Sequence, residues 1–521
     1  MKINIFFKSG ILGDLVAVLS GMLLTLAFAP FGIYPLAVVS PAILLALWHF
    51  VSPRTAFWRG FLFGLGLFGS GVYWVYISIH TYGKTSSFIA FLITSGLIAI
   101  LALFPAFNGF LLNRFFQKRN LSRVICAFPA IWVLLEWVRS WIFSGFPWLF
   151  LGYSQANSPL KGFAPYLSVY GISLALLVSS GLLFVSALSF RQNKFKNLYY
   201  CLLGISFIWT LGGILNYVTW TKPEGEPIKV SLLQGNIEQN LKWSPDQVEP
   251  TLKNYLSLTE KSWGSKIIIW PEASIPVPLD YAQDFINLLD EKAKQNHAAI
   301  ILGLPVRAQQ PQSFYNAVIT LGEGSGVYVK HRLVPFGEYI PSFSLLHKIF
   351  NLMQIPMSEF IPGLGTSKPI QVGNIKISTF ICYEIAFPER VLTRDKDINI
   401  ILTVSNDAWF DGSIAQAQHL EMAQMRALEL QRPVLFVSNT GITAFINADG
   451  KVLSQAPQNQ TYVLTDNIQP KKGRTPLQLT GIDPALILIT LFFWIGIRSK
   501  RESDIPKKSA PNKQEALTES V

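Results

Sequence analysis

The stretch Ile375-Lys-Ile-Ser-Thr-Phe-Ile-Cys-Tyr-Glu384 is the part of this chain that best indicates its fold. An apolar run typical of a buried β-strand ends there at Cys382, one of only three cysteines in 521 residues. Cys126 and Cys201 lie inside long apolar segments, where cysteine behaves as a small apolar residue. Cys382 therefore has no obvious disulfide partner. A lone thiol at a strand end is either a core residue or a nucleophile.

The composition divides the chain into parts. Half of the residues are hydrophobic, 14% are charged and 13% are aromatic, which favours a membrane protein. We expect a transmembrane domain of seven helices over 1–222 and an α/β catalytic domain over 223–475. An eighth transmembrane helix follows over 476–499. The tail, 500–521, is rich in Lys, Glu, Ser and Pro, so we expect it to be disordered.

Eight stretches are apolar enough to cross about 30 Å of hydrocarbon, which takes roughly 20 residues each. The first carries Asp14 and lacks a clear cleavage site, so we interpret it as a retained helix and not a signal peptide. The expected spans are 11–29, 34–50, 57–79, 88–112, 124–143, 163–189, 199–218 and 480–498.

The net charge of +12 follows the pattern of a membrane protein. When the loops are assigned alternately to the two sides, one side holds most of the basic residues, which is typical of cytoplasmic loops. This side carries Lys2, Lys8, Arg54, Arg59, Arg114, Lys118, Arg119, Arg123, Arg191, Lys194, Lys196, Arg498, Lys500 and Arg501, whereas the short loops opposite carry Lys84 and Lys161. Both termini are therefore expected in the cytoplasm and 223–475 outside it. Nucleic-acid binding is disfavoured.

Short apolar runs alternate with amphipathic stretches across 223–475, which predicts a layered domain of sheets and helices. We expect helices at 247–263, 281–295 and about 414–431. The expected strands are Val230–Leu233, Lys266–Trp270, Ala299–Leu304, Ala317–Leu321, Val327–Lys330, Lys376–Cys382, Ile398–Val404, Val434–Ser438 and Thr443–Asn447.

A cysteine attacks as its thiolate, so it needs a base for its proton and donors for the oxyanion that forms. Glu272 and Lys330 each stand at the end of an expected strand, as Cys382 does. Glu272 could act as the base, while the Lys330 ammonium and the backbone N–H of Tyr383 could bind the oxyanion. Each residue alone is more often a surface charge or a core residue; the three strand ends together favour catalysis.

The order Glu, Lys, Cys resembles the catalytic triad of the nitrilase, or carbon–nitrogen hydrolase, superfamily. Both halves of the chain also resemble the apolipoprotein N-acyltransferases, over nearly all of the sequence up to about residue 500. The motifs that carry this resemblance are Gln234–Ile237, Trp270–Ser274, Lys330–Tyr339, Cys382–Glu384 and Ser405–Phe410, with Glu136–Arg139, Gly145–Trp148 and Gly152–Gln155 in the apolar half.

The resemblance implies a fold and a set of roles. The fold is a membrane bundle of eight helices carrying an αββα nitrilase-like sandwich. Glu272 would be the general base, Lys330 the oxyanion stabiliser and Cys382 the nucleophile. The remaining implied residues are Glu338 and Glu384, which support the triad, and Trp243, Tyr383 and Trp409, which line the substrate entrance or else only pack in the core.

One further feature points to a lipid, and another concerns two charged residues in an expected span. The segment Phe343–Met353 is apolar at roughly helical spacing, so it is either an amphipathic arm in the membrane interface or a core helix. Glu136 and Arg139 are costly in hydrocarbon, so we expect them to pair or to face a polar cavity.

By resemblance, the protein would sit in a bacterial inner membrane with its catalytic domain on the periplasmic side. It would take an acyl chain from a phospholipid through a Cys382 thioester and pass it to the N-terminal diacylglyceryl-cysteine of an apolipoprotein. No metal or cofactor is expected, because no His/Cys cluster has ligand spacing, and a monomer is expected. The chief alternative is a membrane-tethered amidase or nitrilase; a catalytically inactive binding module and a transporter are less favoured.

Overall fold

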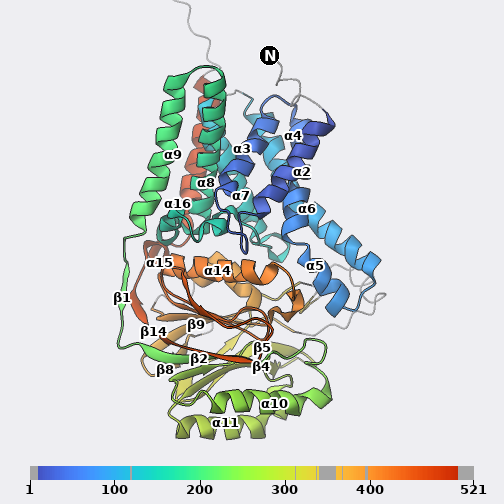
Figure 1. The fold of residues 1–521 in the computed structure, drawn as a ribbon, viewed down its shortest axis with the longest axis vertical. Coiled ribbons are helices and arrows are strands. Elements are labelled where there is room, and N and C mark those ends of the chain that lie inside the picture. Colours follow the sequence, from blue (N-terminus) through green and yellow to red (C-terminus); the bar gives the residue numbers. More distant parts are fainter. Residues whose placement is uncertain are drawn as a thin grey trace, which may run out of the picture.

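The computed structural model describes residues 10–117, 120–310, 312–335, 337–339, 360–365, 368–392 and 397–502. A bundle of helices stands on two stacked β-sheets (Figure 1). Helix α14 (Ala415–Leu430) runs across the junction between them, and α10 (Pro245–Glu260) and α11 (Gln283–Gln295) cover the far side of the sheets. The expected arm at 343–353 and the tail beyond residue 502 lie outside the described residues.

Every apolar stretch expected to cross the membrane contains a helix. Several are broken, and the stretch expected at 57–79 bends by 52° between α4 and the pair α5 and η1. The helices of this part are α2 (Ile11–Thr25), α3 (Leu36–Trp48), α4 (Pro53–Gly71), α5 (Trp74–Ile77), η1 (Ser78–Tyr82), α6 (Ser87–Phe115), η2 (Arg123–Ala127), α7 (Phe128–Arg139), η3 (Ile142–Ser144), η4 (Leu151–Gln155), η5 (Pro159–Phe163), α8 (Ala164–Arg191), α9 (Phe195–Leu215) and α16 (Asp483–Glu502).

The expected number of eight spans is not confirmed. Within the described residues, three helices are long and apolar enough to cross a membrane, or four if the bent pair forms one span. Helices α2 and α3 have 15 and 13 residues, which at 1.5 Å per residue reach only about 22 and 20 Å. Hydropathy detects an apolar stretch, but it does not reveal where the helix inside that stretch ends.

The two sheets contain every strand expected from the sequence, shifted by at most a few residues. The six-stranded sheet has the order β14-β2-β3-β4-β5-β7, and the seven-stranded sheet has the order β13-β12-β11-β10-β9-β8-β6. The strands are β1 (Thr221–Pro223), β2 (Ile228–Gln234), β3 (Ile267–Ile269), β4 (Ala299–Arg307), β5 (Phe314–Gly322), β6 (Gly324–Ser325), β7 (Val327–Val329), β8 (Ile370–Val372), β9 (Ile375–Ile381), β10 (Ile400–Ser405), β11 (Val434–Ser438), β12 (Ala444–Ile446), β13 (Val452–Gln455), β14 (Tyr462–Ile468) and β15 (Lys471–Gly473).

The sheets pack face to face because their central strands are apolar on both sides. Strands β9, β10 and β11 are parallel, and such strands have near-continuous apolar sequences since both faces are covered. Their inner side chains form one core with those of β2, β3 and β4. Helices α10 and α11 cover the outer face of the six-stranded sheet, and α14 covers that of the other. The predicted αββα sandwich is confirmed.

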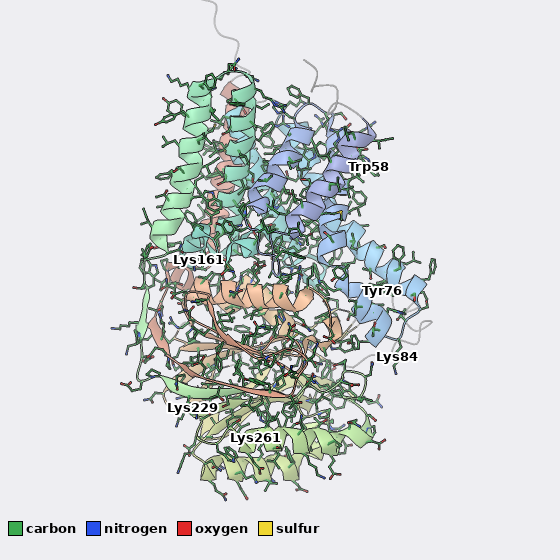
Figure 2. The ribbon with its side chains drawn as sticks, in the orientation of Figure 1. Trp58, Tyr76, Lys84, Lys161, Lys229 and Lys261 are labelled. Atoms are coloured by element: carbon green, nitrogen blue, oxygen red, sulfur yellow. The ribbon has the colours of Figure 1, made fainter. Side chains whose placement is uncertain are left out.

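The chain enters and leaves the sandwich side by side. Strand β1, after α9, pairs antiparallel with β15, which precedes α15 (Pro476–Thr480) and α16. The Thr475 hydroxyl caps α15 and also donates to the Glu429 carbonyl at the end of α14. Lys161, at the junction in Figure 2, donates from Nζ to the Asp449 carbonyl. These contacts tie the helices to the sandwich.

Candidate active site

Glu272 emerges just beyond the carboxyl end of β3, as the sequence predicted. The loop that carries it lies directly against β4 at Gly303. A Cβ on Gly303 would lie 2.7 Å from the Ala273 nitrogen and 2.9 Å from the Glu272 Cα, closer than side chains pack. The absence of a side chain at Gly303 therefore lets the loop hold Glu272 over the sheet edge.

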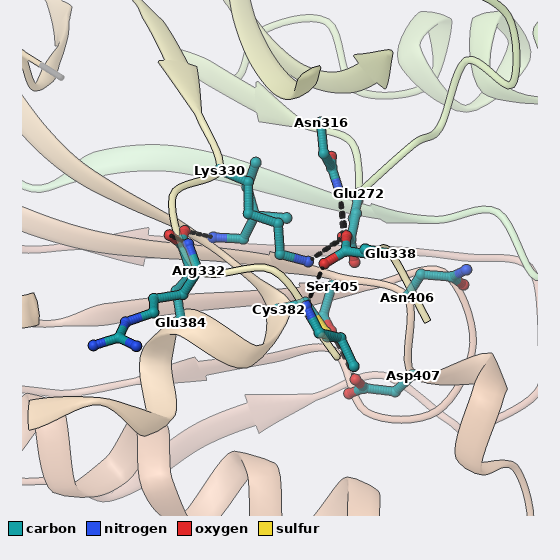
Figure 3. A network of polar contacts seen from close by, with 12 residues as sticks. Glu272, Asn316, Lys330, Arg332, Glu338, Cys382, Glu384, Ser405, Asn406 and Asp407 are labelled. Atoms are coloured by element: carbon teal, nitrogen blue, oxygen red, sulfur yellow. Dashed lines mark hydrogen bonds and ion pairs between the residues drawn. The ribbon is translucent and has the colours of Figure 1, made fainter. Parts of the chain in front are cut away.

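Two charged side chains and an amide meet around the Glu272 carboxylate (Figure 3). Lys330, which follows β7, donates from Nζ to Glu272 Oε1 at 3.1 Å and to Glu338 Oε1 at 2.8 Å. Asn316, on β5, donates to the same two oxygens at 2.7 and 3.1 Å. The Lys330 side chain is 1% exposed and that of Glu272 9%, so this is a buried cluster of two carboxylates around one ammonium.

Burial, together with the charges in this cluster, sets the protonation of the nucleophile. Burial alone lowers the pKa of Lys330, but Glu272 and Glu338 outweigh it and hold that pKa well above its usual value. Burial raises the pKa of Cys382 well above its usual value and Glu272 adds to this, whereas Lys330 and a hydrogen bond with Ser405 oppose it. The resting thiol therefore keeps its proton at neutral pH. Attack requires a base.

Cys382 begins the turn η7 (Cys382–Ala386), with a φ of +52°. Glu384, two residues on, does not point at the thiol. Its Oε2 accepts from the Ile381 N–H and the Tyr328 hydroxyl, and its Oε1 from the N–H groups of His331 and Arg332. Figure 3 shows Glu384 turned toward Arg332. Glu384 therefore joins the nucleophile turn to the segment after Lys330.

A cavity of about 1950 Å³ opens beside this cluster. Its wall includes Glu272, Lys330 and Cys382 from the sandwich, and mostly apolar side chains from α5, η1 and α6. The site is therefore continuous with a large apolar space between the sandwich and the helices.

The three aromatic residues expected at the substrate entrance all line this cavity. Tyr383 stacks on Trp148, with ring centroids 6.4 Å apart, and donates its hydroxyl to the Gly145 carbonyl. Trp409 packs edge-on against Tyr82 of η1. Trp243 is 48% exposed. Tyr383 is thus held tightly by the helical part, and Trp243 is the most open of the three.

Glu136 and Arg139 of α7 have different hydrogen-bond partners. Glu136 Oε1 accepts from the Trp132 ring N–H and from the Leu151 N–H. Arg139 donates to the Trp148 carbonyl at 2.6 Å, lies over the Phe150 ring and forms part of the cavity wall. Arg139 thus lines a cavity, but one with mostly apolar walls and not the polar cavity that was expected.

The comparisons with known proteins agree with both halves of this architecture. The family model described as apolipoprotein N-acyltransferase N-terminal domain matches residues 20–182, and that described as carbon-nitrogen hydrolase matches residues 229–475. An apolipoprotein N-acyltransferase of Coxiella burnetii is 45% identical over 92% of this chain and 99% of its own length.

The chain belongs to the apolipoprotein N-acyltransferase family. A second relative of that name, from Azotobacter vinelandii, is 38% identical over 95% of this chain and 96% of its own. The solved carbon-nitrogen hydrolase of Helicobacter pylori G27 aligns with 56% of this chain and 99% of its own, at 14% identity and a TM-score of 0.36. The resemblance stated from the motifs is confirmed.

In this member of the apolipoprotein N-acyltransferase family, the structure adds polar residues that sequence reasoning missed. Asn316 interrupts an apolar strand, a signal that could have been noticed. Lys242 is buried and donates to the Glu272 carbonyl; burial lowers its pKa to about 8. Asp407 lies within the Ser405–Phe410 motif and His419 on α14, and the local sequence around neither residue marks it as functional.

Proposed function

We propose that this protein transfers an acyl chain from a membrane phospholipid to the N-terminal amine of a diacylglyceryl-cysteine apolipoprotein, through a thioester on Cys382. The supporting observation is the cavity of about 1950 Å³ that joins Glu272, Lys330 and Cys382 to apolar side chains of α5, η1 and α6. A small nitrogen compound would need no such apolar space, and the family match across residues 20–182 also disfavours the amidase alternative.

In the first half-reaction Glu272 takes the proton of the Cys382 thiol, and the sulfur attacks the carbonyl carbon of the phospholipid ester. The Lys330 ammonium and the Tyr383 N–H bind the oxyanion of the tetrahedral intermediate. The carbon–oxygen bond to the glycerol then breaks. The leaving oxygen takes the proton from Glu272, which releases a lysophospholipid and leaves the thioester.

In the second half-reaction the lipoprotein amine attacks the thioester carbonyl and gives a proton to Glu272. The carbon–sulfur bond breaks, and the thiolate takes that proton back. Glu338 supports the reaction by sharing the Lys330 ammonium, and Glu384 by fixing the nucleophile turn. Trp243, Tyr383 and Trp409 contact substrate at the cavity wall. No metal or organic cofactor takes part.

We place the protein as a monomer in the inner membrane of a bacterium, with eight spans, both termini in the cytoplasm and the 223–475 domain on the periplasmic side. Residues 1–222 form the seven-helix membrane domain, 476–499 the eighth span and 500–521 a cytoplasmic tail. The distribution of basic residues between the loops supports this orientation.

The acyl-enzyme provides the test of function. Purified protein incubated with phospholipid in detergent should gain one acyl group on Cys382, removable by hydroxylamine, and lose it when a diacylated lipopeptide is added. Intact-protein mass spectrometry reads both steps. A Cys382→Ala protein that still transfers acyl chains would contradict the proposal, as would an adduct that persists with the lipopeptide.

The topology has a separate test. A phosphatase that folds only in the oxidising periplasm, fused after residue 240, should be active in cells. The same reporter fused after residue 54 should be inactive. The opposite pattern would overturn the orientation without touching the chemistry.

A further inference from the structure

Behind the nucleophile lies a second polar cluster that the proposed reaction does not use. The Ser405 hydroxyl, at the end of β10, donates to Asp407 Oδ1 at 2.6 Å. Asp407, in η8 (Asp407–Phe410), faces His419 Nδ1 at 3.1 and 3.3 Å from its two oxygens. His419, on α14, places Nε2 3.1 Å from the backbone carbonyl oxygen of Cys382. Figure 3 shows Ser405 and Asp407 beside Cys382.

The protonation of His419 follows from its partners. One ring nitrogen faces a carboxylate and the other a peptide carbonyl, and neither group has a proton to donate. A neutral imidazole has only one N–H, so satisfying both contacts requires an imidazolium. The side chains of His419 and Asp407 are 3% and 0% exposed, which leaves little room for water to serve instead.

The surroundings of His419 agree with a positive charge. Burial lowers the pKa of His419, but Asp407 outweighs it and the pKa is raised overall, with Glu272 contributing at longer range. The rings of Trp148 at 5.9 Å and Phe436 at 5.1 Å also lie against His419, and neither titrates. The backbone carbonyl of Cys382, on the other side of the ring, does not titrate either.

The carbonyl that His419 contacts belongs to a strained residue. Cys382 is not glycine, and a φ of +52° is a strained conformation that persists only where the surroundings hold it. Glu384 holds the turn from one side through the Ile381 N–H. His419 holds it from the other through the Cys382 carbonyl.

That same peptide group carries the N–H of Tyr383. A trans peptide is planar, so its C=O and N–H point in opposite directions, and fixing one fixes the other. A cationic donor on the carbonyl oxygen also polarises the peptide and strengthens its N–H as a donor. An imidazolium at His419 is therefore placed to aim and strengthen the oxyanion donor next to the nucleophile.

We propose that His419, kept as an imidazolium by Asp407, is a positioning residue that orients and polarises the Cys382–Tyr383 peptide for oxyanion binding. This rests on the proposed function, since the oxyanion arises in thioester formation. The alternative is a purely structural role, in which His419 only holds α14 against the sheet. The two differ in what they predict for the rate of acylation and for the charge on the ring.

The kinetic test follows thioester formation on Cys382 by quenched-flow mass spectrometry with phospholipid in detergent. We expect His419→Ala to slow acylation by about 10²–10³-fold, the loss typical when an oxyanion donor is removed, with the half-saturating phospholipid concentration within twofold. His419→Gln can donate to the carbonyl but carries no charge, so it should acylate at least tenfold faster than His419→Ala. The matched control is His297→Gln, at a position 88% exposed, which should acylate at the wild-type rate.

The spectroscopic test uses the unmodified chain. Of six histidines, the one whose ¹⁵N imidazole signals vanish in His419→Gln should show two protonated nitrogens at pH 7 in the wild type. In Asp407→Asn the same ring should lose its proton at lower pH. A neutral His419 ring at pH 7 in the wild type overturns the inference even if the His419→Ala protein does not fold.

The outcomes separate the two proposals. A wild-type protein that forms no hydroxylamine-sensitive adduct defeats the proposed function. A wild-type protein that forms it, beside a folded His419→Ala protein that acylates within threefold of the same rate, defeats only the role given to His419. The same role is defeated if His419→Ala raises only the half-saturating phospholipid concentration and leaves the maximal acylation rate unchanged.

Discussion

Two buried clusters in this protein have the same charges and different settings. In the catalytic cluster, Glu272 and Glu338 surround Lys330. In the junction cluster, where α14 meets α8, Glu429 pairs with Arg426 at 3.1 Å with both side chains fully buried, and Glu389 lies close by. Each cluster thus has two carboxylates and one cation.

The partners of the junction cluster show how its setting differs from that of the catalytic cluster. Glu429 accepts from the Ser168 hydroxyl and the Val169 N–H of α8, and Glu389 accepts from the Tyr170 hydroxyl. These contacts run between the helices and the sandwich, and among the described residues that line the large cavity neither Glu389 nor Glu429 appears. Buried charge alone therefore does not mark a site. Access to a space where substrate fits does.

The largest effect should come from Lys330→Met. Removing the ammonium takes away an oxyanion donor and leaves two carboxylates unpaired, so acylation of Cys382 should fall by about 10³-fold or more. Single-turnover mass spectrometry measures it. A Lys330→Met protein that remains folded and acylates within tenfold of wild type would remove the basis for calling the first cluster catalytic.

Arg426→Met is the matched change in the junction cluster. Breaking a buried pair by removing one partner should cost about 3–5 kcal/mol of stability, because Glu429 stays buried without its cation. The thermal unfolding midpoint, followed by tryptophan fluorescence, should drop. The acylation rate per folded molecule, measured well below that midpoint, should stay at the wild-type value. Normal thermal stability combined with lost acylation would reverse the roles of the clusters.

Lys242 should have an effect of intermediate size. It is a buried cation, but its hydrogen-bond partner is a carbonyl and not a carboxylate. Its pKa in the folded protein is about 8, against about 10.4 for a lysine in an unfolded chain. Between these values the unfolded state binds more protons, so stability rises with pH. Relative to Lys242→Met, the wild type should gain about 2.5 kcal/mol of stability between pH 8 and 10.4. Chemical denaturation at several pH values checks this; a constant difference would contradict it.

The smallest effect belongs to an exposed pair. Arg474 and Asp397 lie 2.7 Å apart, but their side chains are 41% and 62% exposed. Solvent screens such a pair, so Arg474→Ala should change stability by no more than about 0.5 kcal/mol. Denaturation with and without added salt measures it. A cost above about 2 kcal/mol would mean that exposure is a poor guide to the strength of ion pairs here.

The sequence allowed the sandwich to be predicted because its strands are apolar on both faces and end at polar residues. Glu272, Lys330 and Cys382 were found in that way, since Lys330 and Cys382 directly follow strands and Glu272 stands three residues beyond the end of β3. Lys242 and His419 were not, because each acts on a backbone carbonyl brought near only by tertiary packing. A sequence pattern records which residues are apolar, but it does not record which distant carbonyl a side chain will reach.

The helical part was predicted less well for a related reason. The apolar stretches were located correctly, but the one at 57–79 was expected to be continuous. The structure breaks it after Gly71, where Val72 leaves helical geometry with a φ of −129°. The following residues, Trp74 and Tyr82, pack against Phe410 and Trp409 of the sandwich. The bend follows from contacts with a domain that hydropathy treats separately.

The ribbon formed by β1 and β15 makes the whole sandwich an insertion with adjoining ends. Neighbouring strands lie about 4.8 Å apart, so the chain enters and leaves the sandwich at almost the same place. Such an insert could be removed and its ends joined by a short loop without pulling the helices apart. The sandwich could in turn be produced alone with its termini side by side.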